Sequence, residues 1–140
     1  IFLIALAAGM ALFQNKSKFG VSNYVELDWR DLAELEYTTG EAPEKLKQQD
    51  KKEVRIPGFM VPLEDNQKEV TEFLLVPSPQ ACIHVPPPPP NQMVYVHMQD
   101  GAKYMYGPIW IYGEFHIMSK RHMYGESSFT MKGIKVEQYR

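Results

Sequence analysis

Five consecutive prolines, Pro86 to Pro90, constrain the fold of this chain more than any other feature. Proline lacks a backbone N–H and its ring fixes φ, so such a run follows an extended polyproline II path. Neither a helix nor a central strand can continue through it, and we expect a rigid, irregular connection. The single cysteine, Cys82, and His84 stand just before the prolines, and Asn91 and Gln92 directly follow them. A stiff backbone beside a thiol and an imidazole suits a preorganised binding site.

Length and charge indicate a single domain without a strong electrostatic field. The chain has 140 residues, of which 44% are apolar, and this is enough to build one core. We expect residues 1–22 to form a signal-like apolar segment with a linker, and residues 23–140 to form a single globular domain. The net charge of −2 argues against electrostatic binding of nucleic acid or of a membrane surface.

An uncharged apolar stretch runs from Ile1 to Phe13. A membrane-spanning helix needs about 20 apolar residues, so this stretch is more typical of the core of a secretion signal. An uncleaved membrane anchor and a buried core helix are the alternatives. The interpretation predicts a periplasmic or otherwise exported protein, with no strong membrane-surface binding apart from this segment.

Two short helices are predicted before the strands. Asp28 is a suitable N-cap for a first helix, in which Trp29, Leu32 and Leu35 recur at near-helical spacing. Pro43 suits the first turn of a second, mostly charged helix over residues 44–49.

Residues beyond position 52 alternate between apolar and polar in the manner of β-strands. Pro57 and Gly58 indicate a kink in the first strand, and a turn at residues 99–101 closes the third. Ile134 is expected to continue the apolar alternation of the last strand. We expect a basic turn or helical link over residues 119–125. The predicted strands are 54–63, 71–76, 93–98, 108–117 and 128–136.

Five short strands after one or two short helices predict a mainly β fold. The bent first strand favours a small, partly open five-stranded barrel of the oligonucleotide/oligosaccharide-binding (OB) type. A β-sandwich is the alternative.

The candidate site is a metal site built on Cys82 and His84. Residues two apart in extended backbone point to the same face, so the two side chains could share one ion. Zinc accepts thiolate and imidazole ligands, and copper accepts the same pair. Three further histidines could supply a third ligand, and we take His116 as the candidate among His97, His116 and His122. Ordinary strand histidines at positions 97 and 116, and a solvated His122, are the alternative.

Two other functions are compatible with the same segment. Pro86, Pro87 and Pro88 could dock onto a partner protein while the cysteine is simply buried. A thiol enzyme would need a lowered Cys82 pKa, but no second cysteine stands at Cys-x-x-Cys spacing, so enzymatic activity is not expected.

Three motifs resemble the bacterial family called domain of unknown function 3299. They are the stretch from Ile56 to Glu64, the stretch from Glu72 to Pro77, and the segment from Ala81 to Gln92 with its Cys-x-His and prolines. The resemblance implies exported proteins with a small OB-like barrel, some of them associated with metal homeostasis or with ABC-type export systems. It also implies Cys82, His84, Asn91 and Gln92 as the functional cluster. Some relatives carry a second cysteine where this chain has Ile83.

Together these observations predict a non-enzymatic, exported barrel that binds zinc and assists a membrane transporter. The alternative is an interaction module of a membrane or ABC-type complex in which Cys82 is structural.

Overall fold

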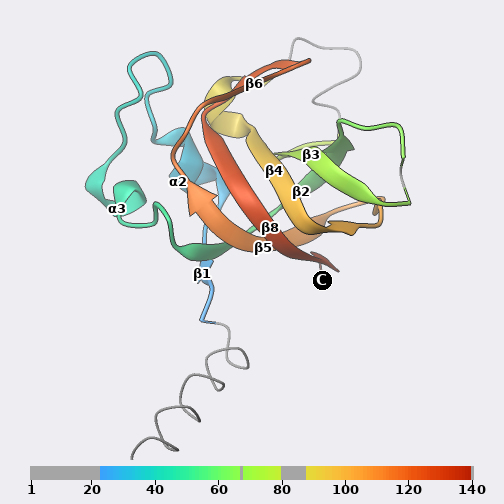
Figure 1. Cartoon of the computed structure of the whole chain (residues 1–140). Helices are drawn as coiled ribbons and strands as arrows, with labels where there is room; N and C mark the ends of the chain where they lie inside the picture. Colours follow the sequence, from blue (N-terminus) through green and yellow to red (C-terminus); the bar gives the residue numbers. More distant parts are fainter. Residues whose placement is uncertain (1–22, 67, 80–87, 140) are drawn as a thin grey trace, which may run out of the picture.

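A computed structural model describes residues 23–66, 68–79 and 88–139. Five strands form a closed barrel in the order β2-β3-β4-β8-β5, and β5 pairs back onto β2 (Figure 1). All neighbours are antiparallel except β4 and β8, which run parallel. The strands are β2 (Glu53–Pro62), β3 (Val70–Val76), β4 (Val94–Ala102), β5 (Ile109–His116) and β8 (Phe129–Gln138).

This order confirms the predicted five-stranded, OB-like barrel, although the barrel is closed where a partly open one was expected. Because every barrel strand has two neighbours, the sandwich alternative does not apply. A short strand, β1 (Val25–Glu26), lies outside the barrel and pairs in parallel with β2.

The bend in β2 closes the barrel. Its first half pairs with β5 as far as Gly58, and its second half, from Phe59, pairs with β3. A Cβ atom at Gly58 would lie 2.8 Å from the carbonyl oxygen of Val76 and 2.9 Å from Cγ of Leu75. Only glycine therefore allows β3 to approach the bend so closely, and the predicted kink is confirmed.

Apolar side chains fill the barrel because every second residue of each strand points inward. Ile56, Phe73, Val96, Phe115 and Phe129 are buried there. A second, smaller cluster of Leu74, Val76 and Met93 is also buried, and Tyr124 packs against it. β3 is thus buried on both faces, which explains its uninterrupted apolar run.

The two predicted helices are present. Asp28 caps α2 (Trp29–Ala33) in a reciprocal capping box with Asp31. Pro43 stands at the N-cap of α3 (Glu44–Lys47), one position before the predicted first turn. Within the described residues, no helix has the length and apolar character needed to cross a membrane.

Three local expectations are wrong. β4 continues through the expected turn at 99–101, because Ala102 still has a partner in Val70 of β3 after a bulge. The expected link at 119–125 is an antiparallel hairpin, β6 (Lys120–His122) and β7 (Gly125–Ser127). Ile134 does not continue the apolar alternation and is 42% exposed.

Candidate functional site

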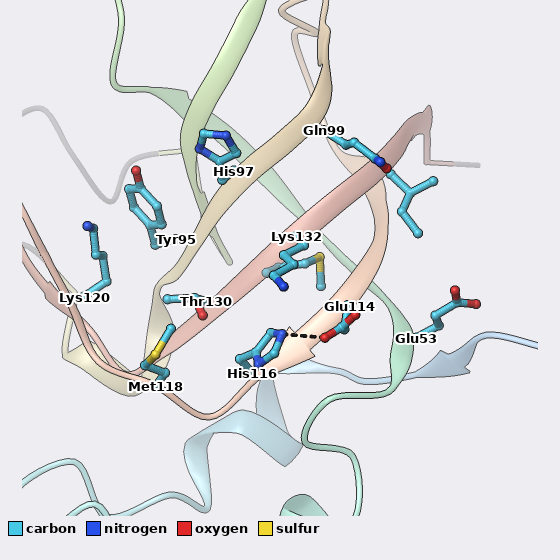
Figure 2. A pocket seen from close by; sticks show the side chains of 12 residues that line it. Glu53, Tyr95, His97, Gln99, Glu114, His116, Met118, Lys120, Thr130 and Lys132 are labelled. Atoms are coloured by element: carbon cyan, nitrogen blue, oxygen red, sulfur yellow. Dashed lines mark ion pairs between the residues drawn. The ribbon is translucent and has the colours of Figure 1, made fainter.

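An open groove of about 880 Å³ lies on the outer face of β4, β8 and β5 (Figure 2). Its size falls in the range of about 300–1,000 Å³ that is usual for ligand sites. Side chains from all three strands and from the start of the β6–β7 hairpin line it, together with Glu53 at the start of β2.

Two cross-strand rows form the floor of the groove. In the first row, Thr130 of β8 pairs with Tyr95 of β4 on one side and with His116 of β5 on the other. Thr130 is only 8% exposed and stands at the centre of the row.

The second row lies two residues further along each strand and is charged. Lys132 of β8 pairs with His97 on one side and Glu114 on the other. The row continues outward to Glu72 of β3, opposite His97, and to Glu53 of β2, opposite Glu114. Since residues two apart share a face, the two rows point the same way.

A β-bulge supplies one apolar border of the groove. Tyr112 pairs with Lys135 and Gly113 pairs with Gly133, which leaves Ile134 without a partner on β5. The extra residue turns outward, so its side chain lines the groove and not the core. This is the physical reason for the exposure of Ile134.

The segment that enters the hairpin forms the other border. Met118 lines the groove and is 57% exposed. The ammonium group of Lys120 lies 5.3 Å from the centre of the Tyr95 ring, within cation–π distance.

Both histidines of the groove face a carboxylate. Nε2 of His116 lies 2.8 Å from Oε1 of Glu114, and Nδ1 of His97 lies 3.4 Å from Oε1 of Glu72. The His116 side chain is 18% exposed, whereas that of His97 is 60% exposed. Among the described residues, however, Nε2 of His116 has no partner that meets hydrogen-bond geometry, so its approach to Glu114 is a close polar contact and not the ordinary hydrogen bond that was expected.

Tyr95 is a neutral hydrogen-bond donor in this surface. Burial raises the pKa of Tyr95 to about 12, with smaller contributions from a hydrogen bond to the Glu72 carboxylate and from the negative charges of Glu72 and Glu64. Glu64 is itself held by the Thr71 hydroxyl and by the backbone N–H groups of Thr71 and Glu72, and the Thr71 hydroxyl contributes most to lowering its pKa.

Four predicted site residues, Cys82, His84, Pro86 and Pro87, lie outside the described residues. Pro88 is half-buried at the start of the described part that follows them. His116, the predicted third ligand, lies in the groove. In the described ranges, no group of three or more His, Cys, Asp or Glu side chains is arranged to hold a metal ion.

Asn91 and Gln92 hold the end of the proline run against α2. They belong to a 3₁₀ turn, η1 (Pro90–Gln92). The Asn91 amide donates to the carbonyl oxygens of Ala33 (3.2 Å) and Leu35 (3.1 Å), and the Gln92 amide donates to that of Trp29 (3.2 Å). Ala33 ends α2 and Leu35 follows it, where a helix leaves carbonyls without internal partners, whereas Trp29 is the first residue of α2.

His122 is half-buried in the hairpin, so the expectation of a solvated side chain is wrong. Its Nδ1 accepts a hydrogen bond from the Tyr124 backbone N–H (3.2 Å), and its Nε2 lies 2.9 Å from Oγ of Ser127. In the neutral ring the proton is therefore on Nε2, which donates to Ser127. Burial lowers the pKa of His122.

Comparison with known families identifies the chain. The sequence profile described as Protein of unknown function (DUF3299) matches residues 22–138. The chain belongs to this family. The membership inferred from the three motifs is thereby confirmed.

A solved DUF3299 structure shares the fold. A DUF3299 family protein from Pseudomonas aeruginosa PAO1 has 33% sequence identity and a TM-score of 0.69, over 85% of this chain and 98% of that one. No curated protein matches the sequence. The comparisons thus establish a small β-barrel of an uncharacterised family.

Sequence reasoning named His116 and His97 as possible metal ligands but did not find the groove, and it missed Lys132 and Thr130. A signal was present in each strand, since polar residues stand two apart at His97 and Gln99, at Glu114 and His116, and at Thr130 and Lys132. Joining these pairs requires the knowledge that β8 lies between β4 and β5.

Proposed function

We propose that this DUF3299 protein is a non-enzymatic binding module that docks onto a partner through the groove. The observation that carries the proposal is the groove itself, an open, preformed hollow lined by both polar and exposed apolar side chains. Such mixed surfaces are typical of sites that recognise other molecules.

The His122–Ser127 pair supports a role without catalysis. A serine nucleophile needs a histidine that accepts its proton, whereas this imidazole donates to the hydroxyl. Ser127 is also fully buried, out of reach of a substrate. The pair is better suited to holding the hairpin together.

We place the protein in the periplasm or another exported location, as an accessory to a membrane transporter or ABC-type complex. The apolar segment of residues 1–13 and the family resemblance support this assignment. Fusion of residues 1–22 to alkaline phosphatase, which is active only after export, tests the location. Activity equal to that of a leaderless fusion would contradict it.

Photo-crosslinking in cells tests the binding function. Benzoylphenylalanine at Ile134 should give an adduct of defined mass, and Thr130→Arg, which fills the centre of the groove, should abolish it. Position 139 is the matched control, because Tyr139 is 44% exposed against 42% for Ile134 and does not line the groove. Equal adducts at both positions, or no adduct at Ile134, would refute the proposal.

Zinc binding through Cys82 and His84 is the second candidate. Its support is their spacing, together with the anchoring of the chain at the last of the prolines, where the Pro90 carbonyl accepts from the Ser128 N–H (2.9 Å). A fixed backbone there lowers the entropic cost of presenting the two ligands.

Zinc titration with a competing chromophoric chelator tests this candidate. The unsubstituted protein should bind zinc, and Cys82→Ser and His84→Ala should bind it weakly. His116→Ala tests whether His116 contributes a third ligand. Equal uptake by the unsubstituted protein and the Cys82 and His84 variants would exclude the site.

A further inference from the structure

We propose that the groove recognises an extended, acidic segment of a partner polypeptide. This inference rests on the proposed binding function and adds the chemistry of the partner. Figure 2 shows the residues that carry it, with Lys120 at one side of the groove and Lys132 near its centre.

The two lysines of the groove have no carboxylate partner. Among the described residues, no Asp or Glu oxygen lies within 4.0 Å of the ammonium groups of Lys120 or Lys132, and the same holds for Lys47 and Lys103 outside the groove. Both groove lysines are exposed. They can therefore meet an incoming carboxylate without first breaking an ion pair.

The carboxylates beside them are already engaged. Glu114 faces His116 at 2.8 Å, and Glu72 faces His97 at 3.4 Å while it also accepts from the Tyr95 hydroxyl. The oxygens of Glu72 and Glu114 thus face polar groups of the protein, whereas the ammonium groups of Lys120 and Lys132 face no carboxylate within 4.0 Å among the described residues. The Thr130 hydroxyl, at the centre of the first row, adds a neutral polar group beside them.

Glu53 makes one end of the groove unfavourable for acidic groups. It lies at the β2 end of the charged row and has no ion pair among the described residues, so that end repels acidic groups. Acidic residues of a partner are therefore favoured over the Lys120–Lys132 region and disfavoured towards Glu53.

The groove suits an extended chain with apolar residues between the acidic ones. Strand spacing of about 4.8 Å makes the floor from β4 to β5 about 10 Å wide, which three or four extended residues can span. Met118 and Ile134, at its borders, expose apolar surface that alternate side chains of such a segment can cover.

A nucleic acid, the other anionic polymer, fits the lining less well. Single-stranded nucleic acids are bound by stacking bases on aromatic rings. Among the described residues that line the groove, Tyr95 is the one Phe, Tyr or Trp, and Lys120 lies over its ring. Phosphates in regular succession would also meet Glu53.

Fluorescence anisotropy of labelled probes tests the proposal on the purified chain. The probe is an eight-residue peptide in which glutamate alternates with leucine and threonine, and its counterpart carries lysine in place of glutamate. We expect the acidic peptide to bind, more weakly as salt rises, and the lysine peptide not to bind. The double variant Lys120→Glu/Lys132→Glu should lose about tenfold or more in affinity.

The matched control is Lys47→Glu/Lys103→Glu, which makes the same change in net charge at two exposed lysines outside the groove. It should bind like the parent. Circular dichroism of both double variants establishes that each is folded. Equal loss in the two double variants, or equal binding of the two peptides, would overturn the proposal. Tighter binding of an eight-residue oligothymidine than of the acidic peptide would assign the groove to nucleic acid.

The crosslinking experiment separates this inference from the proposed function. If the Ile134 adduct forms and Thr130→Arg abolishes it while the acidic peptide does not bind, the groove is a docking site for a different chemistry. If no groove-specific adduct forms, the binding function itself fails.

Discussion

The indole nitrogen of Trp29 donates a 2.6 Å hydrogen bond to the carbonyl oxygen of Pro57. The bond joins α2 to the point at which β2 bends. Pro57 pairs with Trp110 on β5, and the next residue, Gly58, begins the approach to β3. The helix outside the barrel is therefore attached at the bend that closes it.

Trp29→Phe should reduce the free energy of unfolding by about 1–3 kcal/mol, because it leaves the Pro57 carbonyl without its partner. Urea denaturation measures the change. Trp110→Phe is the matched control, since the Trp110 indole makes no hydrogen bond among the described residues. An equal loss in both variants would show that ring size, and not the hydrogen bond, is responsible.

Gly58→Ala should destabilise the barrel by about 1–3 kcal/mol, because the added Cβ meets the backbone of Val76. Gly101→Ala is the control: its Cβ would meet Cγ of Glu69 at 2.5 Å, but this exposed side chain can swing away. We expect a change within about 0.5 kcal/mol for the control. Equal thermal or urea midpoints for the two variants would contradict this account of the bend.

An unsatisfied buried polar group costs about 1–3 kcal/mol, and Asn91→Asp should lower the free energy of unfolding by more than this. The substitution keeps the shape of the side chain but turns a carboxylate towards the carbonyls of Ala33 and Leu35. Asn66→Asp is the control, because Oδ1 of Asn66 accepts from the Lys68 N–H and a carboxylate can do the same. Urea denaturation at neutral pH should separate the variants. If neither variant changes stability, the hydrogen bonds from Asn91 to α2 and Leu35 do not stabilise the fold.

The features that depend on neighbouring residues could be predicted from the sequence. The α2 cap depends on Asp28 and residues within one turn of it, and the bend depends on Pro57 and Gly58. Alternation also predicted strands over residues 108–117 and 128–136, where the structure has β5 and β8. Local chemistry and strand periodicity were sufficient for these features and for the barrel.

The features that depend on distant strands could not be predicted. Tyr124, in the β6–β7 hairpin, packs against Leu74 and Val76, about fifty residues earlier in the chain. Ile134 turns outward because Gly113 and Gly133 pair across two strands. The groove requires β8 to lie between β4 and β5, and no local pattern reveals that order.

His122 should make stability depend on pH. Burial lowers the pKa of His122 in the folded protein, while in the unfolded chain it returns to about 6.5. The unfolded state therefore binds more protons as pH falls below about 6.5, so the free energy of unfolding decreases until the folded-state pKa is passed. Protonation also removes the lone pair on Nδ1 that accepts from the Tyr124 N–H.

Urea denaturation at pH 7.5 and at pH 5.0 measures this dependence, and His122→Asn isolates the contribution of His122. The asparagine oxygen can accept from the Tyr124 N–H but does not titrate, and His97 and His116 are present in both proteins. We expect the parent protein to lose more stability than His122→Asn between the two pH values. Equal losses would show that the His122 imidazole is not the group that makes stability depend on pH.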